Sequence, residues 1–230
     1  MKTIGLIGGM SWESTVTYYQ LINDYVKDHL GGLHSAKLLL YSVDFEEIER
    51  WQASGDWDKS AQRLTDIAKK LEGAGADFIV ICTNTMHKVV PQMEKALSIP
   101  ILHIADATAD VLLEAGIRTV GLLGTKYTMT QNFYRSRLEQ RGLSVVIPDG
   151  AGVEKVNDVI YHELCLGIIR EESRAYYRQV IGQLKAKGAQ GVILGCTEIG
   201  LLISQEDSSL PVFDTTRIHG EAAARKAIEA

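Results

Sequence analysis

The sequence has few of the features that mark export, membrane insertion or structural metal binding. Its beginning, MKTIGLIGG, lacks the long apolar segment and cleavage site of a signal peptide, and no apolar run is long enough to span a bilayer. The chain has three cysteines, Cys82, Cys165 and Cys196, and no CxxC pair. An odd number of thiols without a signal peptide favours the reduced state, and the missing pair argues against structural zinc. We therefore expect a cytoplasmic protein that holds no metal and binds no membrane.

Motifs of several enzyme classes are missing as well. The segment GLIGGMS resembles a dinucleotide-binding loop but lacks GxGxxG, and the chain has neither a P-loop nor the GxSxG of serine hydrolases. Lysine and arginine form no concentrated run, and the formal net charge is −5. Nucleic acid is therefore not an expected partner, although a small acidic substrate remains compatible with this charge.

What the chain does have is an alternation of short β-type runs with longer helical patterns. Its 230 residues, 46% hydrophobic and 23% charged, suffice for one large domain or two of about 100 residues. Strands are expected at 2–8, 36–44, 77–82, 99–104, 119–124, 143–148, 191–196 and 210–214, and helices at 14–30, 58–75 and 85–97. Strands rich in Val, Ile and Leu between helices indicate an α/β fold with parallel sheets covered on both faces.

The sequence also repeats itself. Three segments of the first half resemble three of the second, in the same order: 4–19 and 120–134, 75–85 and 188–198, 98–106 and 209–217. Measured from Gly8 to Gly124, Gly75 to Gly188 and Ser98 to Ser209, the offsets are 116, 113 and 111 positions. Strands of α/β proteins resemble one another by chance, but the matching polar loops favour a duplication.

The duplication predicts two similar Rossmann-like domains related by a pseudo-two-fold axis, with the active site in the cleft between them. We expect the first domain to comprise residues 1–98 and 211–230, and the second residues 99–210. In open parallel sheets, ligands bind at the carboxyl ends of strands. The loops GGMS, CTNT, GTKYT and GCTE follow such strands, so their backbone N–H groups are expected to bind an anion such as a carboxylate.

The repeat changes the interpretation of the first cysteine. At the offset of 113, Cys82 aligns with Gly195 and Thr83 with Cys196. Neighbouring side chains of a strand face opposite sides, so Cys82 and Thr83 cannot both face one site. We therefore expect Cys82 to pack in the core, as free cysteines commonly do, and Thr83 and Cys196 to be the reactive pair.

The other candidates follow from their surroundings. A helix is expected to begin just after Cys196, which would lower the thiol pKa and favour the thiolate. Cys165 lies in an apolar helix-like pattern and is expected to be a core thiol. His87, His103 and His219 follow or lie within the paired loops, where supporting a loop and taking part in catalysis both remain open.

These motifs resemble the aspartate/glutamate racemase family, the PLP-independent amino-acid racemases, most closely its enterobacterial broad-specificity or glutamate-acting type. The resemblance covers nearly the whole chain. It is carried by residues 4–11, 83–87, 123–125 with Thr128, 195–198 and 214–219.

The resemblance implies racemisation without pyridoxal phosphate, metal or any other cofactor. One residue from each half flanks the α-carbon of an amino acid; one removes the α-proton and the other supplies a proton to the opposite face. On this pattern Thr83 and Cys196 are catalytic. The substrate-binding residues would be Met10, Ser11, Gln52, Asn84, Thr85, Thr125, Thr197 and Glu198. A homodimer is the expected assembly.

The chain departs from the family pattern in one catalytic position. Family members usually carry cysteine in both loops, whereas Thr83 stands in the first. A hydroxyl is a poorer base than a thiol, so we expect an asymmetric enzyme in which Cys196 takes the proton of the L-enantiomer and Thr83 reprotonates the other face. The neutral Gln52 weakens the case for a strictly acidic substrate and admits other polar amino acids. Glu198 either orients the substrate ammonium or caps the following helix.

Two alternatives stay open on the sequence alone. A single thiol is compatible with a carbanion enzyme of the arylmalonate decarboxylase type, in which cysteine protonates a carbanion formed by loss of CO₂. A non-catalytic amino-acid-binding protein would need the same loops but no reactive cysteine.

Overall fold

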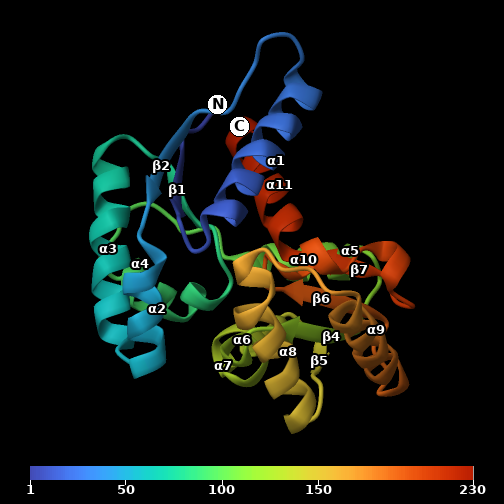
Figure 1. Ribbon diagram of the computed structural model, residues 1–230. Helices are drawn as coiled ribbons and strands as arrows, with labels where there is room; N and C mark the ends of the chain where they lie inside the picture. The colour runs from blue at the N-terminus through green and yellow to red at the C-terminus, as the bar shows by residue number, and fades with distance from the viewer. Residues whose placement is uncertain (230) are drawn as a thin grey trace. The chain divides into compact units, whose positions relative to one another are not determined.

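The computed structural model describes residues 1–229 and has an α/β fold with two parallel sheets, as the sequence predicts (Figure 1). Contacts divide the chain into two compact units. The first comprises residues 1–104 with the C-terminal segment from His219 on, and the second comprises residues 105–218. Within residues 1–229, no helix is long and apolar enough to cross a bilayer.

The first unit is built on a three-stranded sheet. Its order is β2-β1-β3, with β1 at Ile4–Gly8, β2 at Leu38–Ser42 and β3 at Phe78–Ile81. The helices are α1 (Trp12–Leu30), α2 (Phe45–Ser54), α3 (Trp57–Gly73), the 3-10 helix η1 (Thr85–Val89), α4 (Val90–Glu94) and most of α11 (Thr215–Ile228). In Figure 1, α3 lies on one side of this sheet and α1 with α11 on the other.

Strand alternation divides the core of this unit into two clusters. Ile79 and Ile81 of β3 pack in the cluster that includes side chains of α3. Phe78, Val80 and Cys82 pack in the other, with side chains of α1 and α11. Cys82 is fully buried there, which confirms that it is a packing residue.

The second unit is built on a four-stranded sheet. Its order is β5-β4-β6-β7, with β4 at Thr119–Gly124, β5 at Ser144–Val146, β6 at Gly191–Gly195 and β7 at Val212–Asp214. The helices are α5 (Ile104–Glu114), α6 (Lys126–Thr130), α7 (Asn132–Gln140), α8 (Gly150–His162), η2 (Leu164–Leu166), α9 (Glu171–Ala186), α10 (Ile199–Leu202) and η3 (Gln205–Asp207). Both α8 and α9 contact β4, a central strand of this sheet.

The central strand pairs of the two units have the same register. In the first unit Ile4 of β1 stands opposite Phe78 of β3. In the second, Val120 of β4 stands opposite Gly191 of β6. Val120 follows Ile4 by 116 positions and Gly191 follows Phe78 by 113 positions, which are two of the offsets found in the sequence repeat. The duplication therefore extends to the pairing of individual residues.

The third strand of the repeat is formed in the second unit but is reduced to a single bridge in the first. Residues 99–104 do not form the predicted strand: only Ile101 makes a bridge, to Ile79. Its equivalent 111 positions later is Val212, which pairs with Val192 as part of the three-residue strand β7. The helices α5 and α11 that follow also begin 111 positions apart. The first repeat therefore keeps the position of this strand but turns into its helix after a single bridge.

Two further expectations differ from the structure. The predicted helix at 85–97 is split into η1 and α4, with Pro91 in the first turn of α4, where its missing N–H is tolerated. The boundaries between the units fall after Ile104 and Ile218, a few residues beyond those predicted at 98 and 210. Residues 212–214 lie in the second unit because β7 pairs with β6.

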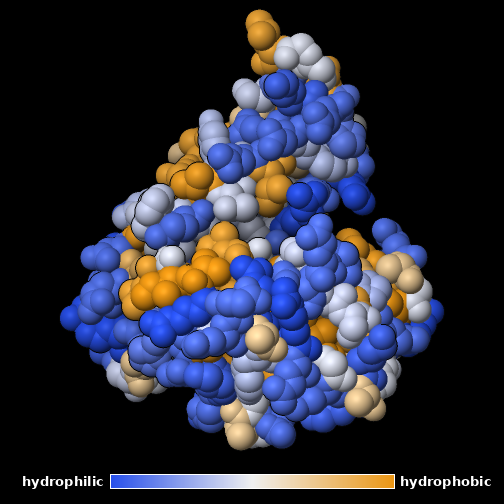
Figure 2. Space-filling model, turned by 45° about the vertical axis from the view of Figure 1, so that its right-hand side comes forward, coloured by the Kyte–Doolittle hydropathy of each residue, from blue (hydrophilic) through white to orange (hydrophobic). Residues whose placement is uncertain are grey.

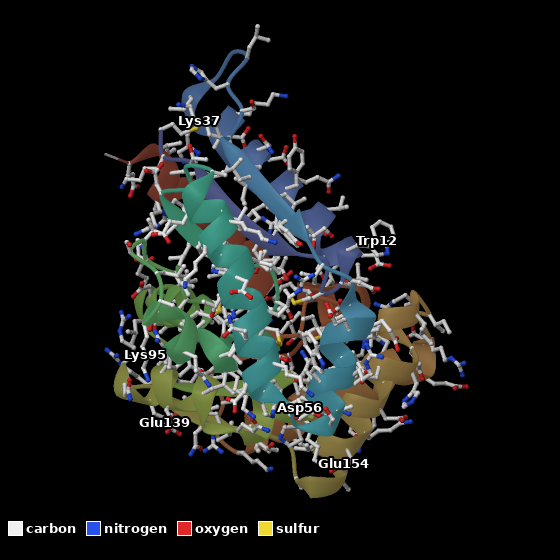
Figure 3. All side chains as sticks on the ribbon, turned by 90° about the vertical axis from the view of Figure 1, so that its left-hand side faces the viewer. Trp12, Lys37, Asp56, Lys95, Glu139 and Glu154 are labelled. Carbon is white, nitrogen blue, oxygen red and sulfur yellow. The ribbon has the colours of Figure 1, made fainter. Side chains whose placement is uncertain are left out.

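Hydrophobic side chains also reach the surface in places. Figure 2 shows orange groups interrupting a largely hydrophilic face. Trp12, the first residue of α1, is 65% exposed, and Figure 3 shows its side chain pointing away from the ribbon. Trp12 directly follows the GGMS loop, whose four residues, 8–11, are themselves buried.

Candidate active-site loops

The loop after β1 is a tight turn that depends on glycine. Gly9 has φ of +90°, and a Cβ on it would lie 2.3 Å from the Val43 carbonyl oxygen, so no larger residue fits. The Ser11 hydroxyl caps α1 by accepting from the Ser14 backbone N–H at 3.4 Å. Ser11 is thereby held at the helix N-terminus, where the sequence predicts that substrate binds.

Met10 and Gln52, two predicted substrate-binding residues, lie in the interior of the first unit. Met10 is 2% exposed and belongs to the same hydrophobic cluster as Met86. Gln52, on the last turn of α2, is buried, and its Nε2 donates to Met86 Sδ at 2.9 Å. Their positions beside Met86, in the helix that follows the CTNT loop, are compatible with substrate contact, which stays a prediction.

The loop after β3 separates the buried thiol from the threonine that follows it. Burial raises the pKa of the Cys82 thiol far above its ordinary value, so this thiol is inert in the folded protein. Thr83 is only partly buried. Its N–H donates to the Ile81 carbonyl at 2.8 Å, and Asn84 and Thr85 continue into η1 as buried residues. The structure thus distinguishes Cys82 from Thr83 as the repeat predicts.

His87 connects the Thr83 backbone to the start of α5. Its Nε2 accepts from the Ile104 N–H at 3.2 Å, which requires an unprotonated Nε2 and assigns the proton to Nδ1. That Nδ1–H donates to the Thr83 carbonyl oxygen at 2.8 Å. His87 therefore supports the loop, one of the two roles left open by the sequence.

His219 has the opposite tautomer. Its Nε2–H donates to the Leu102 carbonyl at 2.8 Å, and its Nδ1 accepts from the Tyr18 hydroxyl at 2.8 Å. Burial lowers the pKa of His219 to about 4, so the ring is neutral near pH 7. No sequence signal joined Tyr18 to His219, because 201 positions separate them. The fold alone brings them together.

The loop after β4 is closed by a threonine cap. The Thr125 hydroxyl accepts from the Thr128 N–H at 3.3 Å and caps α6. The neighbouring Lys126 is paired with Glu154 of α8 at the surface, where Figure 3 marks Glu154. Arg50 is likewise exposed on α2. Thr125 therefore occupies the predicted loop position as a buried cap, whereas Lys126 and Arg50 are exposed.

The loop after β6 places a carboxylate on the remaining candidate thiol. Cys196 Sγ donates to Glu198 Oε2 at 3.0 Å, and the Thr197 hydroxyl donates to the same oxygen at 2.6 Å. Cys196 is 9% exposed and Glu198 6%. Glu198 thus accepts from two side chains of its own loop, a role that the sequence did not predict.

These contacts overturn the expectation of a resting thiolate at Cys196. Burial and the negative charge of Glu198 raise the pKa of the Cys196 thiol well above its ordinary value. The helix that follows, α10, has only four residues, too few for a strong N-terminal field. Cys196 therefore rests as a thiol that donates to a carboxylate.

Two further features of the structure concern the third cysteine, Cys165, and groups of side chains that could bind a metal ion. Cys165 lies in η2 and is half-buried, so it is not the core helix thiol that the sequence predicts. In the part of the chain that the structure describes, no three His, Cys, Asp or Glu side chains are grouped to hold a metal ion.

Comparison with known proteins identifies the family. The family model of the Asp/Glu/hydantoin racemases matches residues 7–223. The chain belongs to this family. The prediction of an aspartate/glutamate racemase relative is therefore confirmed.

Relatives resemble the chain over almost all of its length. The broad-specificity amino-acid racemase RacX of Bacillus subtilis is 26% identical over 220 residues, covering 93% of this chain and 92% of RacX. A Yersinia pestis protein assigned to the Asp/Glu racemases is 60% identical, with a TM-score of 0.94 over the whole of both chains. An aspartate racemase homologue from Pyrococcus horikoshii is 37% identical, with a TM-score of 0.86, also over both whole chains. The two-sheet α/β fold is thus the fold of this family.

The lowered pKa of His219 predicts a loss of stability in acid. An unfolded histidine binds a proton near pH 6.5, whereas the folded one does so only near pH 4. As pH falls from 6.5 to 4 the unfolded state gains the proton first, so His219 removes about 3 kcal/mol from the free energy of unfolding. His219→Gln, which keeps a donor for Leu102, should lack this part of the acid dependence in urea titrations. His34→Gln, at an exposed histidine, is the control and should behave as wild type. If the free energy of unfolding of His219→Gln fell between pH 6.5 and 4 as much as that of wild type, His219 would not be the cause of this loss.

Proposed function

We propose that the protein interconverts the enantiomers of an amino acid without a cofactor, with Cys196 and Thr83 acting on opposite faces of the α-carbon. The observation that carries this proposal is the shared register of the two repeats, in which Thr83 and Cys196 follow β3 and β6 at equivalent positions. Family membership supports the reaction class.

The Cys196–Glu198 pair would supply the base for the L-enantiomer. The Cys196 proton moves to Glu198 Oε2, leaving a thiolate and a neutral carboxylic acid, so the total charge of the pair is unchanged. The thiolate then takes the α-proton, and the electron pair of the C–H bond remains on the substrate. The Thr197 hydroxyl donates to the same Glu198 oxygen at 2.6 Å. Glu198 would thus activate the thiol, in addition to any contact with the substrate ammonium.

Thr83 would complete the reaction by donating its hydroxyl proton to the opposite face. The Thr83 alkoxide then regains a proton from water while the Glu198 acid releases one, which restores all three groups. An alcohol is a weak acid, but the carbanion is strongly basic and accepts such a proton. Positioned proton transfer contributes typically about 10²–10⁴-fold, so further stabilisation of the enediolate is needed. Backbone N–H groups and the hydroxyls of Ser11, Thr85, Thr125 and Thr197 would bind the substrate carboxylate as charge shifts onto it, with Asn84 nearby in the CTNT loop.

The substrate proposed is a polar amino acid, with aspartate and glutamate included but not required. RacX has broad specificity by name, and the aspartate racemase homologue bears the name of an acidic substrate. The neutral Gln52 beside Met86 favours the broader range. A cytoplasmic homodimer remains the expected form of the enzyme.

Glu198→Gln tests the proposed base. The amide cannot take the Cys196 proton, so racemisation near pH 7 should fall about 10²-fold or more. Removal of the negative charge should at the same time lower the pKa of the Cys196 thiol, because Glu198 raises it. Alkylation of Cys196 by iodoacetamide, followed by mass spectrometry, should therefore begin at lower pH than in wild type. Glu206→Gln, at an exposed carboxylate, is the control. Wild-type turnover in Glu198→Gln, or an alkylation profile shifted to higher pH, would contradict this role.

Deuterium exchange tests the reaction itself. In D₂O, NMR should show loss of the α-proton signal from single L- and D-amino acids, together with inversion. Cys196→Ala should abolish both, whereas Cys82→Ala, the same change at the other buried thiol, should retain them in a less stable protein. If no amino acid exchanges but a disubstituted malonate loses CO₂, the protein is a decarboxylase instead. Loss of exchange in a folded Cys82→Ala variant would show that the repeat alignment is wrong.

A further inference from the structure

We propose that His87 is a positioning residue for Thr83, and that it serves only this one of the two proton carriers. The inference rests on the proposed roles of Thr83 and Cys196. It adds to them a residue that touches neither the substrate nor the reacting atoms. Thr83, His87 and the residues that contact the His87 ring all belong to the first unit. The second unit enters only through a comparison of the two repeats.

The backbone of Thr83 is held on both sides. Its N–H donates to the Ile81 carbonyl, and its carbonyl accepts from His87 Nδ1, both at 2.8 Å. The His87 backbone N–H also donates to the Asn84 carbonyl at 3.1 Å. Because the peptide is fixed in this way, rotation about χ1 is the main freedom left to the Thr83 hydroxyl.

The His87 ring itself is immobilised by its neighbours. It is 1% exposed, and its centroid lies 4.5 Å from that of His103 and 5.6 Å from that of His219. His219 is in turn fixed by Leu102 and Tyr18. On its far side, His87 accepts from the first N–H of α5, one of the groups that a helix cannot satisfy internally. The ring therefore ties the Thr83 carbonyl to a helix terminus at a fixed separation.

The two ring hydrogen bonds of His87, to the Thr83 carbonyl and from the Ile104 N–H, form a brace that the second repeat lacks. At the offset of 113, His87 corresponds to Gly200, which has no side chain to donate. A Cβ on Gly200 would lie 3.0 Å from Asp214 Oδ2, and Asp214 is the counterpart of His103 at the offset of 111. The Cys196 carbonyl accepts instead from the backbone N–H of Ile199 at 3.1 Å. The histidine brace thus belongs to the half whose carrier is a hydroxyl.

A physical reason links the brace to the hydroxyl. Proton transfer requires heavy atoms within about 2.6–3.2 Å, and a misplacement of about 1 Å costs about 10²-fold in rate. Cys196 has an adjacent carboxylate to exchange its proton, whereas Thr83 depends on the geometry of its loop. Loss of the brace should therefore slow proton delivery by Thr83 and leave proton removal by Cys196 nearly unchanged.

Two substitutions separate the hydrogen bonds of His87. In His87→Asn, the amide nitrogen lies near the position of Nδ1 and can donate to the Thr83 carbonyl. In His87→Gln, the amide reaches the position of Nε2, so it keeps the bond with Ile104 and loses the one with Thr83. Each variant is incubated in D₂O with an L-amino acid that the wild-type enzyme inverts. NMR and chiral chromatography then measure two early products: the deuterated D-enantiomer, formed by inversion, and the deuterated L-enantiomer, formed by return through Cys196.

The ratio of inversion to return is the readout, because a general loss of structure lowers both products together. We expect this ratio to fall about tenfold or more in His87→Gln and to stay within about twofold of wild type in His87→Asn. An unchanged ratio in His87→Gln, or an equal fall in both variants, would overturn the proposal. If neither variant folds, ¹⁵N NMR of the wild-type histidines decides: a proton on Nδ1 of His87 supports the proposal, and one on Nε2 overturns it.

Thr83→Ala distinguishes this proposal from the one on which it rests. If Thr83→Ala retains inversion, Thr83 is not a proton carrier and the proposed mechanism fails. If Thr83→Ala abolishes inversion while His87→Gln keeps the wild-type ratio, only the role of His87 fails.

Discussion

The parallel pairing of β1 with β3, repeated in the same register by β4 with β6, determines which side chains stand at the strand ends. Strand side chains alternate, so a shift of one residue would exchange the buried and loop-facing sets. In this register Cys82 enters the core with Phe78 and Val80, and Thr83 becomes the first residue of the polar loop. The chemistry proposed for the first half therefore follows from a packing constraint, since the thiol there is the residue that fills the core.

The loops after β3 and β6 hold the two proposed proton carriers in different ways. Cys196 and Thr197 both donate to the Glu198 carboxylate, so the thiol has an immediate proton acceptor. Thr83 is held through its backbone by His87, a side chain whose tautomer is determined by Ile104. In the proposed mechanism, the thiol transfers protons with the help of an adjacent carboxylate. The hydroxyl depends instead on a loop that His87 holds in place. The catalytic asymmetry predicted from the sequence would follow from this difference.

Features encoded locally or by the repeat could be predicted from the sequence. The parallel sheets, the burial of Cys82 and the family follow from strand composition, strand alternation and motifs. Features that depend on distance in the fold could not. The raised pKa of Cys196 depends on the return of Glu198 onto the thiol and on the shortness of α10. The pairing of Tyr18 with His219 joins opposite ends of the chain, and the single bridge at Ile101 reflects how early α5 begins.

If Thr83 stands where a second thiol would act, the decisive measurement is made on Thr83→Cys in D₂O. The measured quantity is the ratio of inversion to deuterated return, starting from the L-enantiomer. A thiol at position 83 is a better proton carrier than a hydroxyl, so this ratio should rise above the wild-type value. An unchanged or lower ratio in a correctly folded variant would contradict the equivalence of Thr83 and Cys196.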